Sequence, residues 1–172
     1  GIIPLGTTNV LARELGIPVD LDGACALLAG ANATAAIDAM RLGDGHFFTQ
    51  VGVGLDALMI RDTPTERKKR FGQAAYLWTA VVRLMGFQPR RFALTVDGQA
   101  IRARASQVLL ANSGTLGTTS LRWGPAVRAD DGRLDVCVVR ARTLGDYLGV
   151  AWSMLRRRPH EDRNIRYYVA ER

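Results

Sequence analysis

Two glycine-containing turns between apolar segments constrain the fold of this chain more than any other feature. Residues 43–45 (Gly-Asp-Gly) separate an apolar run that starts at Ala33 from the segment 46–51. Residues 97–98 (Asp-Gly) divide the segment 92–105, in which apolar and polar residues alternate. Such turns between apolar runs are typical of β-hairpins, and the alternation indicates one face in water. The sequence therefore predicts antiparallel sheet.

The period of the apolar residues predicts the remaining elements. We expect further strands at 108–111, 136–139 and 164–170. We expect helices at 21–28, capped by Asp20, at 73–85, and from Thr143 or Asp146 to Leu155. The helix at 21–28 consists of small apolar residues and should pack tightly against another element. The segments 61–70 and 113–120 are predicted to be loops, the first because it is highly charged and the second because it carries two glycines.

Composition limits the classes of partner. The 172 residues include 23 Lys and Arg against 16 Asp and Glu, a net charge of +7, which favours phosphates, anionic lipid surfaces or nucleic acid. Cys25 and Cys137 are isolated in apolar runs, so we expect both to be buried and neither to form a disulfide or zinc site. The apolar stretches are too short to cross a bilayer. Because the chain begins inside a motif, we expect it to be a fragment of a longer protein.

The first eighteen residues predict a strand, a loop and a helix. Ile2 and Ile3 form an apolar lead, Pro4 to Asn9 a turn of small residues, and Gly16 marks the end of the helix. In such a unit the amides of the loop and the positive end of the helix converge, which favours a phosphate. The same residues are also explained by a simple helix cap, with Asn9 accepting from the first-turn amides. The residues alone leave both interpretations open.

The order of residues in this segment resembles a known family. Pro-Leu-Gly-Thr-Thr-Asn-Val-Leu-Ala-Arg-Glu-Leu-Gly is similar to the Pro-x-Gly-Thr-x-Asn-x-x-Ala-Arg-x-Leu-Gly segment of the diacylglycerol kinase catalytic family, which includes bacterial lipid kinases and sphingosine kinases. Val10 departs from the pattern, since many members have Asp there. Three further segments match in the same order. They are Gly-Val-Gly-Leu-Asp-Ala from Gly52, Lys-x-x-Gly-x-x-Ala-Tyr from Lys69, and Asp-Gly-Arg-Leu from Asp131.

The resemblance implies a role for individual residues. Gly6 and Thr7 would contact the phosphates of ATP, and Asn9 belongs to the same nucleotide site. The Asp131 carboxylate and the backbone carbonyls of Arg128 and Arg133 would bind a structural or regulatory Mg²⁺. Lys69 would belong to a charge network near that loop. Read without the resemblance, the Asp-Asp-Gly segment at 130–132 is an ordinary turn, and the residues alone do not decide between the two.

The resemblance also implies a fold and an activity. The fold is α+β and mainly β: an antiparallel β-sandwich with helical insertions, preceded by a strand-loop-helix remnant of an α/β nucleotide-binding domain. Residues 1–30 would end that domain, and residues 31–172 would form a β-sandwich domain that is incomplete at its C-terminus. The implied reaction transfers the γ-phosphoryl group of ATP to a lipid hydroxyl such as that of diacylglycerol. The family's Glu base would lie beyond Arg172, because Glu171 lacks its Asp-Gly context, so the fragment alone should be inactive.

Other functions remain as alternatives. The resemblance implies a cytoplasmic protein at the inner face of the membrane, whereas the charge also suits a non-enzymatic module that binds membrane or nucleic acid. We expect no nucleic acid partner, because basic residues interleaved with aromatic ones are missing. A NAD-kinase-like enzyme is a further rival. Finally, the residues Arg156 to Arg158 either cap the helix that ends at Leu155 or, with Trp152, place that helix at a membrane interface.

Overall fold

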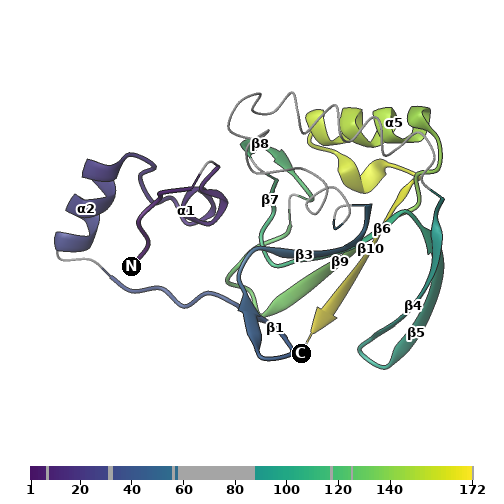
Figure 1. Ribbon diagram of the computed structural model, residues 1–172, viewed down its shortest axis with the longest axis horizontal. Helices are drawn as coiled ribbons and strands as arrows, with labels where there is room; N and C mark the ends of the chain where they lie inside the picture. Colours follow the sequence, from purple (N-terminus) through teal and green to yellow (C-terminus); the bar gives the residue numbers. More distant parts are fainter. Residues whose placement is uncertain are drawn as a thin grey trace.

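The computed structural model describes residues 1–6, 8–30, 33–55, 57, 88–116, 118–124 and 126–171, without the side chains of 116 and 118–121. The helices are α1 (Val10–Glu14), α2 (Leu21–Ala29), α5 (Leu144–Leu155) and the 3-10 turn η1 (Pro159–Glu161). The strands are β1 (Met40–Leu42), β2 (Gly45–Phe47), β3 (Gln50–Gly54), β4 (Arg90–Val96), β5 (Gln99–Ala105), β6 (Gln107–Ala111), β7 (Thr115–Leu116), β8 (Thr118–Arg122), β9 (Arg133–Val139) and β10 (Ile165–Glu171). Figure 1 shows their arrangement. The predicted helix at 73–85 and loop at 61–70 lie outside the described residues.

The central sheet has four antiparallel strands in the order β10-β9-β6-β3. In the middle of this sheet, Leu109 of β6 lies opposite Cys137 of β9 on one side and Gly52 of β3 on the other. The prediction of a central strand at 108–111 is confirmed, because Val108 and Leu109 point to opposite faces and both are buried.

Each face of this sheet is covered by a different element. On one face, Leu109 and Cys137 pack against Val150 and Met154 of α5. On the other face, Val108 and Val138 pack against the hairpin of β4 and β5. Figure 1 shows α5 on one side of the sheet and β4 and β5 on the other. The predicted antiparallel β-sandwich is therefore confirmed.

Both predicted hairpin turns are present. β1 and β2 pair across Gly43 and Asp44, and β4 and β5 pair across Asp97 and Gly98, which have φ of 46° and 80°. Two successive residues with positive φ give a tight turn that matches the twist of the strands. The first hairpin is shorter than predicted, because the chain leaves it after Phe47 and starts β3 in the central sheet.

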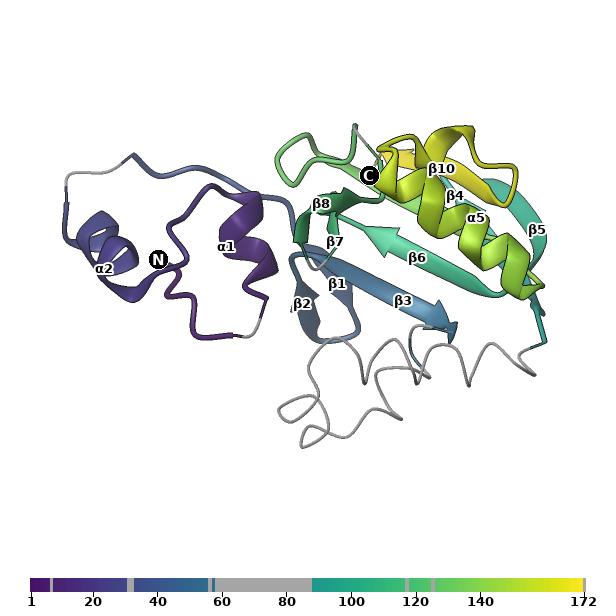
Figure 2. The same ribbon diagram turned by 90° about the horizontal axis from the view of Figure 1, so that it is seen from above.

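The predicted loop at 113–120 is wrong. Thr115 and Leu116 form β7, which pairs with β8 in a small antiparallel hairpin. The side chains of Ser113 and Thr115 are buried. Burial could not be predicted here, because the segment is polar and contains glycines. This hairpin lies next to α1, as Figure 2 shows.

The N-terminal segment differs from the prediction in two respects. Residues 1–5 form no strand, whereas α2 begins as predicted, with the Asp20 carboxylate accepting from Gly23 N at 2.7 Å. Tight packing of α2 was predicted, but Ala24 is its one buried residue. Cys25 is exposed, against the prediction, and Cys137 is buried as predicted. Figure 2 shows α2 on the far side of α1 from the central sheet.

The C-terminal helix α5 begins with a complete capping box. The Thr143 hydroxyl accepts from Asp146 N at 3.1 Å, and the Asp146 carboxylate accepts from Thr143 N at 2.9 Å. The helix then ends at Leu155, as predicted from the spacing of its apolar residues. None of the described helices, α5 included, is both long and apolar enough to cross a membrane.

Candidate functional site

Asn9 organises the loop in front of α1. Its Oδ1 accepts from Gly6 N at 2.8 Å, and its Nδ2 donates to Pro4 O at 3.2 Å. Asn9 occupies the N-cap position with a left-handed φ of 48°, yet its side chain makes no capping bond to the helix. The interpretation of Asn9 as a side-chain cap is therefore wrong, because the side chain folds back over the loop. Thr7 lies outside the described residues.

A partly buried ion pair joins the end of α1 to β8. Arg122 Nη2 lies 3.0 Å from Glu14 Oε1, and Thr115 donates a hydrogen bond to the same carboxylate. Burial alone raises the pKa of Glu14, but the hydrogen bonds from Thr115, Arg122 and the Gly114 amide outweigh it and hold the pKa below its usual value. Arg122 also donates to Val127 O at 3.1 Å, so α1 is linked to the residue that precedes Arg128.

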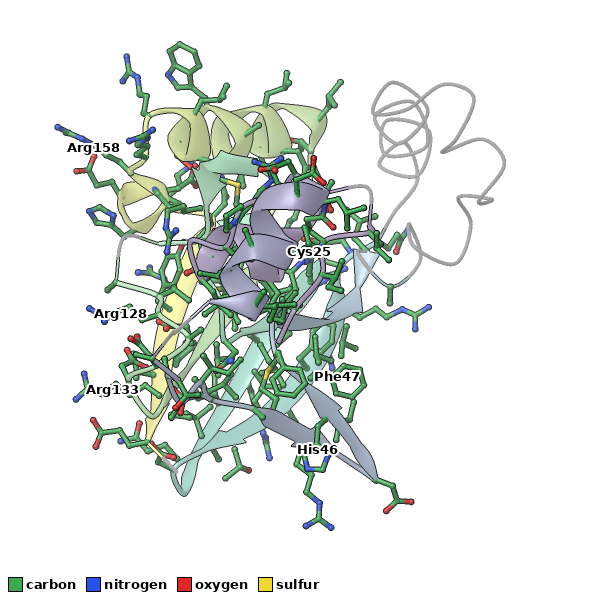
Figure 3. The ribbon with its side chains drawn as sticks, turned by 90° about the vertical axis from the view of Figure 1, so that its left-hand side faces the viewer. Cys25, His46, Phe47, Arg128, Arg133 and Arg158 are labelled. Carbon is green, nitrogen blue, oxygen red and sulfur yellow. The ribbon has the colours of Figure 1, made fainter. Side chains whose placement is uncertain are left out.

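The two arginines of the acidic loop, residues 128–133, are paired with acids other than Asp131. Arg128 makes a two-bond pair with Asp130, with Nε to Oδ1 at 2.9 Å and Nη2 to Oδ2 at 3.0 Å. Arg133 Nη2 lies 2.9 Å from Glu171 Oε1. Figure 3 shows Arg128 and Arg133 on the same edge of the molecule, with both side chains pointing outward. In the described residues no arginine forms an ion pair with Asp131, although Arg128 and Asp131 still attract each other.

Asp38 holds this loop, and the sequence analysis missed it. Its carboxylate accepts from Gly132 N at 2.7 Å, and its own amide donates to Ala129 O at 2.7 Å. The buried Asn112 fixes Asp38 in turn, because Asn112 Nδ2 donates to Asp38 O at 2.8 Å. The available signal was a single carboxylate inside the apolar run before the first hairpin, where a structural acceptor is the usual reason for such a residue.

The acidic loop has donor chemistry that fits a hard cation. Asp131 Oδ1 accepts from Arg133 N at 3.0 Å, which leaves its second oxygen for a ligand role. The pKa of Asp135 is raised, first by burial and then by the negative charge of Asp131. A cation between the two carboxylates would relieve this repulsion. The described residues contain no group of three or more His, Cys, Asp or Glu side chains suited to a metal, so backbone carbonyls and water would complete the coordination.

Within the acidic loop, a hydrogen bond joins Arg133 to Asp131, and no hydrogen bond among the described residues joins Arg128 to Asp131. Among the described residues, no hydrogen bond or ion pair connects Gly6 or Asn9 to residues 128–133. The connection that exists runs from Glu14 through Arg122 to Val127. Lys69, the predicted member of the charge network, lies outside the described residues.

In the matching segment that begins at Gly52, the residue Gly54 is required by the backbone geometry. This residue has a φ of +114°, and a Cβ atom added there would lie 2.4 Å from Ser106 O. Gly54 is therefore required where β3 passes the start of β6, both for its φ and for the close approach.

Comparison with known families gives two matches that divide the chain. Residues 49–156 match the YegS C-terminal NAD kinase beta sandwich-like domain. Residues 1–42 match the diacylglycerol kinase catalytic domain. The boundary between the two matches falls in the β1–β2 hairpin and the short connection to β3.

Individual relatives and solved structures agree with these matches. A protein of Bacillus subtilis named diacylglycerol kinase is 28% identical over 100% of this chain and 56% of its own length. A probable lipid kinase YegS-like protein of Pectobacterium atrosepticum is 30% identical over 88% of this chain and 50% of its own length. The crystal structure of a putative diacylglycerol kinase from Bacillus anthracis superposes with a TM-score of 0.72 and 25% identity, over 98% of this chain and 54% of that protein. The chain thus spans about half the length of the relatives it matches.

Proposed function

This chain belongs to the family of YegS C-terminal NAD kinase beta sandwich-like domains, whose members include lipid kinases, and we propose that it is part of an ATP-dependent lipid kinase. The proposed reaction transfers the γ-phosphoryl group of ATP to the hydroxyl of a lipid such as diacylglycerol. Residues 1–30 would be the end of the nucleotide-binding domain, and residues 31–172 would belong to the β-sandwich domain. The proposed location is the cytoplasmic face of a membrane.

One observation supports the proposal most strongly: among the described residues, the Asp131 carboxylate forms no ion pair, although two arginines, Arg128 and Arg133, lie in the same loop. The Arg128 side chain is paired with Asp130 and the Arg133 side chain with Glu171. Only the backbone carbonyls of these two arginines would therefore be ligands. We therefore propose that the Asp131 carboxylate and the carbonyls of Arg128 and Arg133 hold Mg²⁺. This Mg²⁺ would be structural or regulatory, and when bound it would supply positive charge that offsets the negative charge of the Asp131 carboxylate.

The proposed role of the opening loop follows from its hydrogen bonds. The Gly6 amide donates to Asn9 Oδ1, and the Asn9 side-chain amide donates to Pro4 O. We propose that Gly6 and Thr7 approach the ATP phosphates and that Asn9 keeps the loop in shape by holding Pro4 and Gly6. The lipid hydroxyl also needs a general base. Glu171 does not suit this role, because its carboxylate is paired with Arg133.

The metal half of the proposal is tested by Mn²⁺ binding, followed by electron paramagnetic resonance. We expect Asp131→Asn to weaken binding roughly tenfold or more, since it removes the one charged ligand. Asp44→Asn is the matched control, because Asp44 is an exposed carboxylate in the turn between β1 and β2. Its effect should be much smaller. Equal losses in the two variants would contradict the assignment of Asp131.

The activity is tested with the full-length product of the gene that encodes these residues. Phosphate transfer from ATP to diacylglycerol in detergent micelles should depend on Mg²⁺, and Asp131→Asn should raise the Mg²⁺ concentration required. We propose that the 172 residues alone transfer no phosphate, because none of them is proposed as the general base. Lipid phosphorylation by these residues alone would overturn this arrangement, and an inactive full-length protein would overturn the proposed function.

A further inference from the structure

The outward face of α5 is an uninterrupted apolar ridge. Leu144, Leu148, Trp152 and Leu155 are spaced at three and four residues and therefore share one side of the helix. Their exposed fractions are 48%, 62%, 56% and 62%. The opposite side of the same helix holds Val150 and Met154 in the core. A helix that is apolar on both sides is usually covered on both sides.

No charge interrupts the ridge. The single charged residue of α5 is Asp146, and its carboxylate is used in the capping box at the start of the helix. Of the two hydroxyl side chains in α5, that of Ser153 donates to Val150 O at 2.7 Å, and Tyr147 packs partly buried against the core. Exposed helices in a chain with 23% charged residues normally carry charges on the outer face. The composition of this face is therefore that of an interface.

The two ends of the ridge are basic. Arg142 is exposed before the helix, and Arg156 and Arg157 are exposed after it. The Arg156 guanidinium lies 4.9 Å from the centre of the Trp152 ring. In the described part of the chain, neither Arg156 nor Arg157 forms an ion pair, whereas Arg158 lies 3.5 Å from Glu161. The ridge thus combines apolar side chains with positive charges that have no acidic partner there.

Arg157 also occupies a backbone position that disfavours it. Its φ is +58°, and the hydrogen bonds Arg157 N to Met154 O and Arg158 N to Ser153 O, both 2.9 Å, are those of a helix end that usually has Gly at this position. An arginine at this position costs folding stability relative to glycine. A positive charge at the end of the ridge is a function that glycine cannot provide.

We propose that the α5 ridge is the surface by which this protein lies on an anionic lipid bilayer. Leu148, Trp152 and Leu155 would enter the boundary between acyl chains and headgroups, with α5 parallel to the membrane plane. Arg156 and Arg157 would meet the anionic headgroups beside the Trp152 ring. This inference rests on the proposed function in one respect: a lipid kinase has to meet its substrate at a bilayer.

Charge argues against a second copy of the chain as the occupant. Two α5 ridges related by a twofold axis can run antiparallel or parallel. The antiparallel pair places Arg142 of each copy next to Arg156 and Arg157 of the other, and the parallel pair places Arg156 and Arg157 of the two copies side by side. Like charges facing each other at an apolar contact oppose association, whereas an anionic surface is attracted by both ends of the ridge.

The test measures binding of the protein to vesicles by sedimentation, in the absence of ATP and Mg²⁺. Vesicles of phosphatidylcholine mixed with phosphatidylglycerol should bind it, and binding should weaken with salt and with the omission of phosphatidylglycerol. Leu148→Ser combined with Leu155→Ser should abolish binding. The matched control is Leu42→Ser combined with Val53→Ser, because Leu42 and Val53 are 56% and 52% exposed but lie on other elements.

Arg157→Gly separates the membrane role from a role in folding. We expect this variant to raise the melting temperature, because glycine suits the left-handed position, and to lower vesicle binding roughly fivefold, the typical effect of one basic residue. Arg91→Gln removes an equal charge from the exposed side of β4 and should leave binding nearly unchanged. Equal losses from Arg157→Gly and Arg91→Gln would mean that net charge alone binds the vesicles, which overturns the proposal.

The remaining outcomes of these experiments also test whether the ridge binds a bilayer. If the protein does not bind anionic vesicles, the ridge is not a bilayer surface. The same conclusion follows if Leu148→Ser with Leu155→Ser converts a dimer to a monomer in the ultracentrifuge. The vesicle experiment requires no phosphate transfer, so an inactive kinase that still binds through α5 would refute the proposed function and keep this inference. The opposite result is a full-length enzyme that phosphorylates micellar diacylglycerol while its vesicle binding is unchanged by the ridge variants. That result would support the proposed function and refute this inference.

Discussion

Glu14 of α1 and Arg122 of β8 form an ion pair of unequal burial. The Glu14 side chain is 8% exposed and the Arg122 side chain 34% exposed, with 3.0 Å between Oε1 and Nη2. Because Glu14 is the more buried partner, removing either charge has a different effect. Neutralising Glu14 leaves the Arg122 charge, which water still reaches. Neutralising Arg122 leaves the Glu14 charge, which water does not reach.

The first prediction follows from this inequality. At neutral pH, Arg122→Met should cost about 3 kcal/mol of unfolding free energy, because it strands the Glu14 carboxylate, whereas Glu14→Gln should cost about 1 kcal/mol. The lowered pKa of Glu14 means that the pair stabilises the fold above the usual carboxyl pKa and loses that contribution as pH falls through the lowered value. Urea unfolding at several pH values measures both variants. The penalty of Arg122→Met should shrink in acid, and a pH-independent penalty would contradict this explanation.

Gly54 supplies the second prediction. We expect Gly54→Ala to destabilise the protein by about 3 kcal/mol or more, because the added Cβ meets Ser106 O at 2.4 Å in addition to the strain of φ +114°. Gly43→Ala is the control with strain alone, since Gly43 has φ +58° and no atom within 4 Å of the added Cβ. It should cost about 1 kcal/mol. Thermal unfolding of both variants checks the difference, and similar losses would refute a steric role for Ser106.

The third prediction concerns Asp135, whose pKa is raised by burial and by Asp131. A carboxyl with a raised pKa stabilises the folded state only while it is protonated. The fold therefore loses stability as pH rises from the usual carboxyl pKa through the raised one. Asp135→Asn should stabilise the protein at neutral pH by a few tenths to about 1 kcal/mol. The gain should vanish in acid, and melting temperatures across this pH range would show it. A gain that persists at low pH would point to another cause.

The fourth prediction separates the two cysteines. Cys25 is exposed, whereas Cys137 is buried and its pKa is raised to about 12, first by burial and then by Asp135. Because thiolates are the reactive form, a disulfide reagent should modify Cys25 rapidly in the native protein and Cys137 only after unfolding. Counting modified thiols by mass spectrometry checks this. Cys25→Ser should remove the fast reaction, and a remaining fast phase would contradict the burial of Cys137.

The parts of the fold that sequence could predict are those set by local chemistry. The turns at Gly43 and Asp97, the Asp20 cap and the apolar β6 each follow from neighbouring residues. The β7–β8 hairpin could not be predicted, because its stability depends on Glu14, more than a hundred residues away in the chain. Exposure of Cys25 was missed for a related reason, since apolar residues on α2 do not reveal whether this chain supplies a partner for them.

The residues of the candidate site also fall into those that the sequence could predict and those that it could not. Asp131 was found because it lies in a contiguous motif with Gly132. Asp38 was not found, because its relation to Gly132 arises only when the segment before β1 crosses the acidic loop. The pairing of Arg128 with Asp130 was also invisible in sequence, and it is this pairing that separates the charge of the arginine from the carboxylate of Asp131.

The attachment of Asp38 has a mechanical consequence. Three hydrogen bonds, to Ala129, Gly132 and Asn112, fix this residue to the sheet domain, and the Glu14–Arg122 pair fixes α1. A rotation of α2 against the sandwich must therefore be absorbed by the backbone torsions of residues 15–20 and of the connection between α2 and Asp38. The acidic loop would keep its shape throughout such a rotation, because its anchor lies on the sandwich side of the pivot.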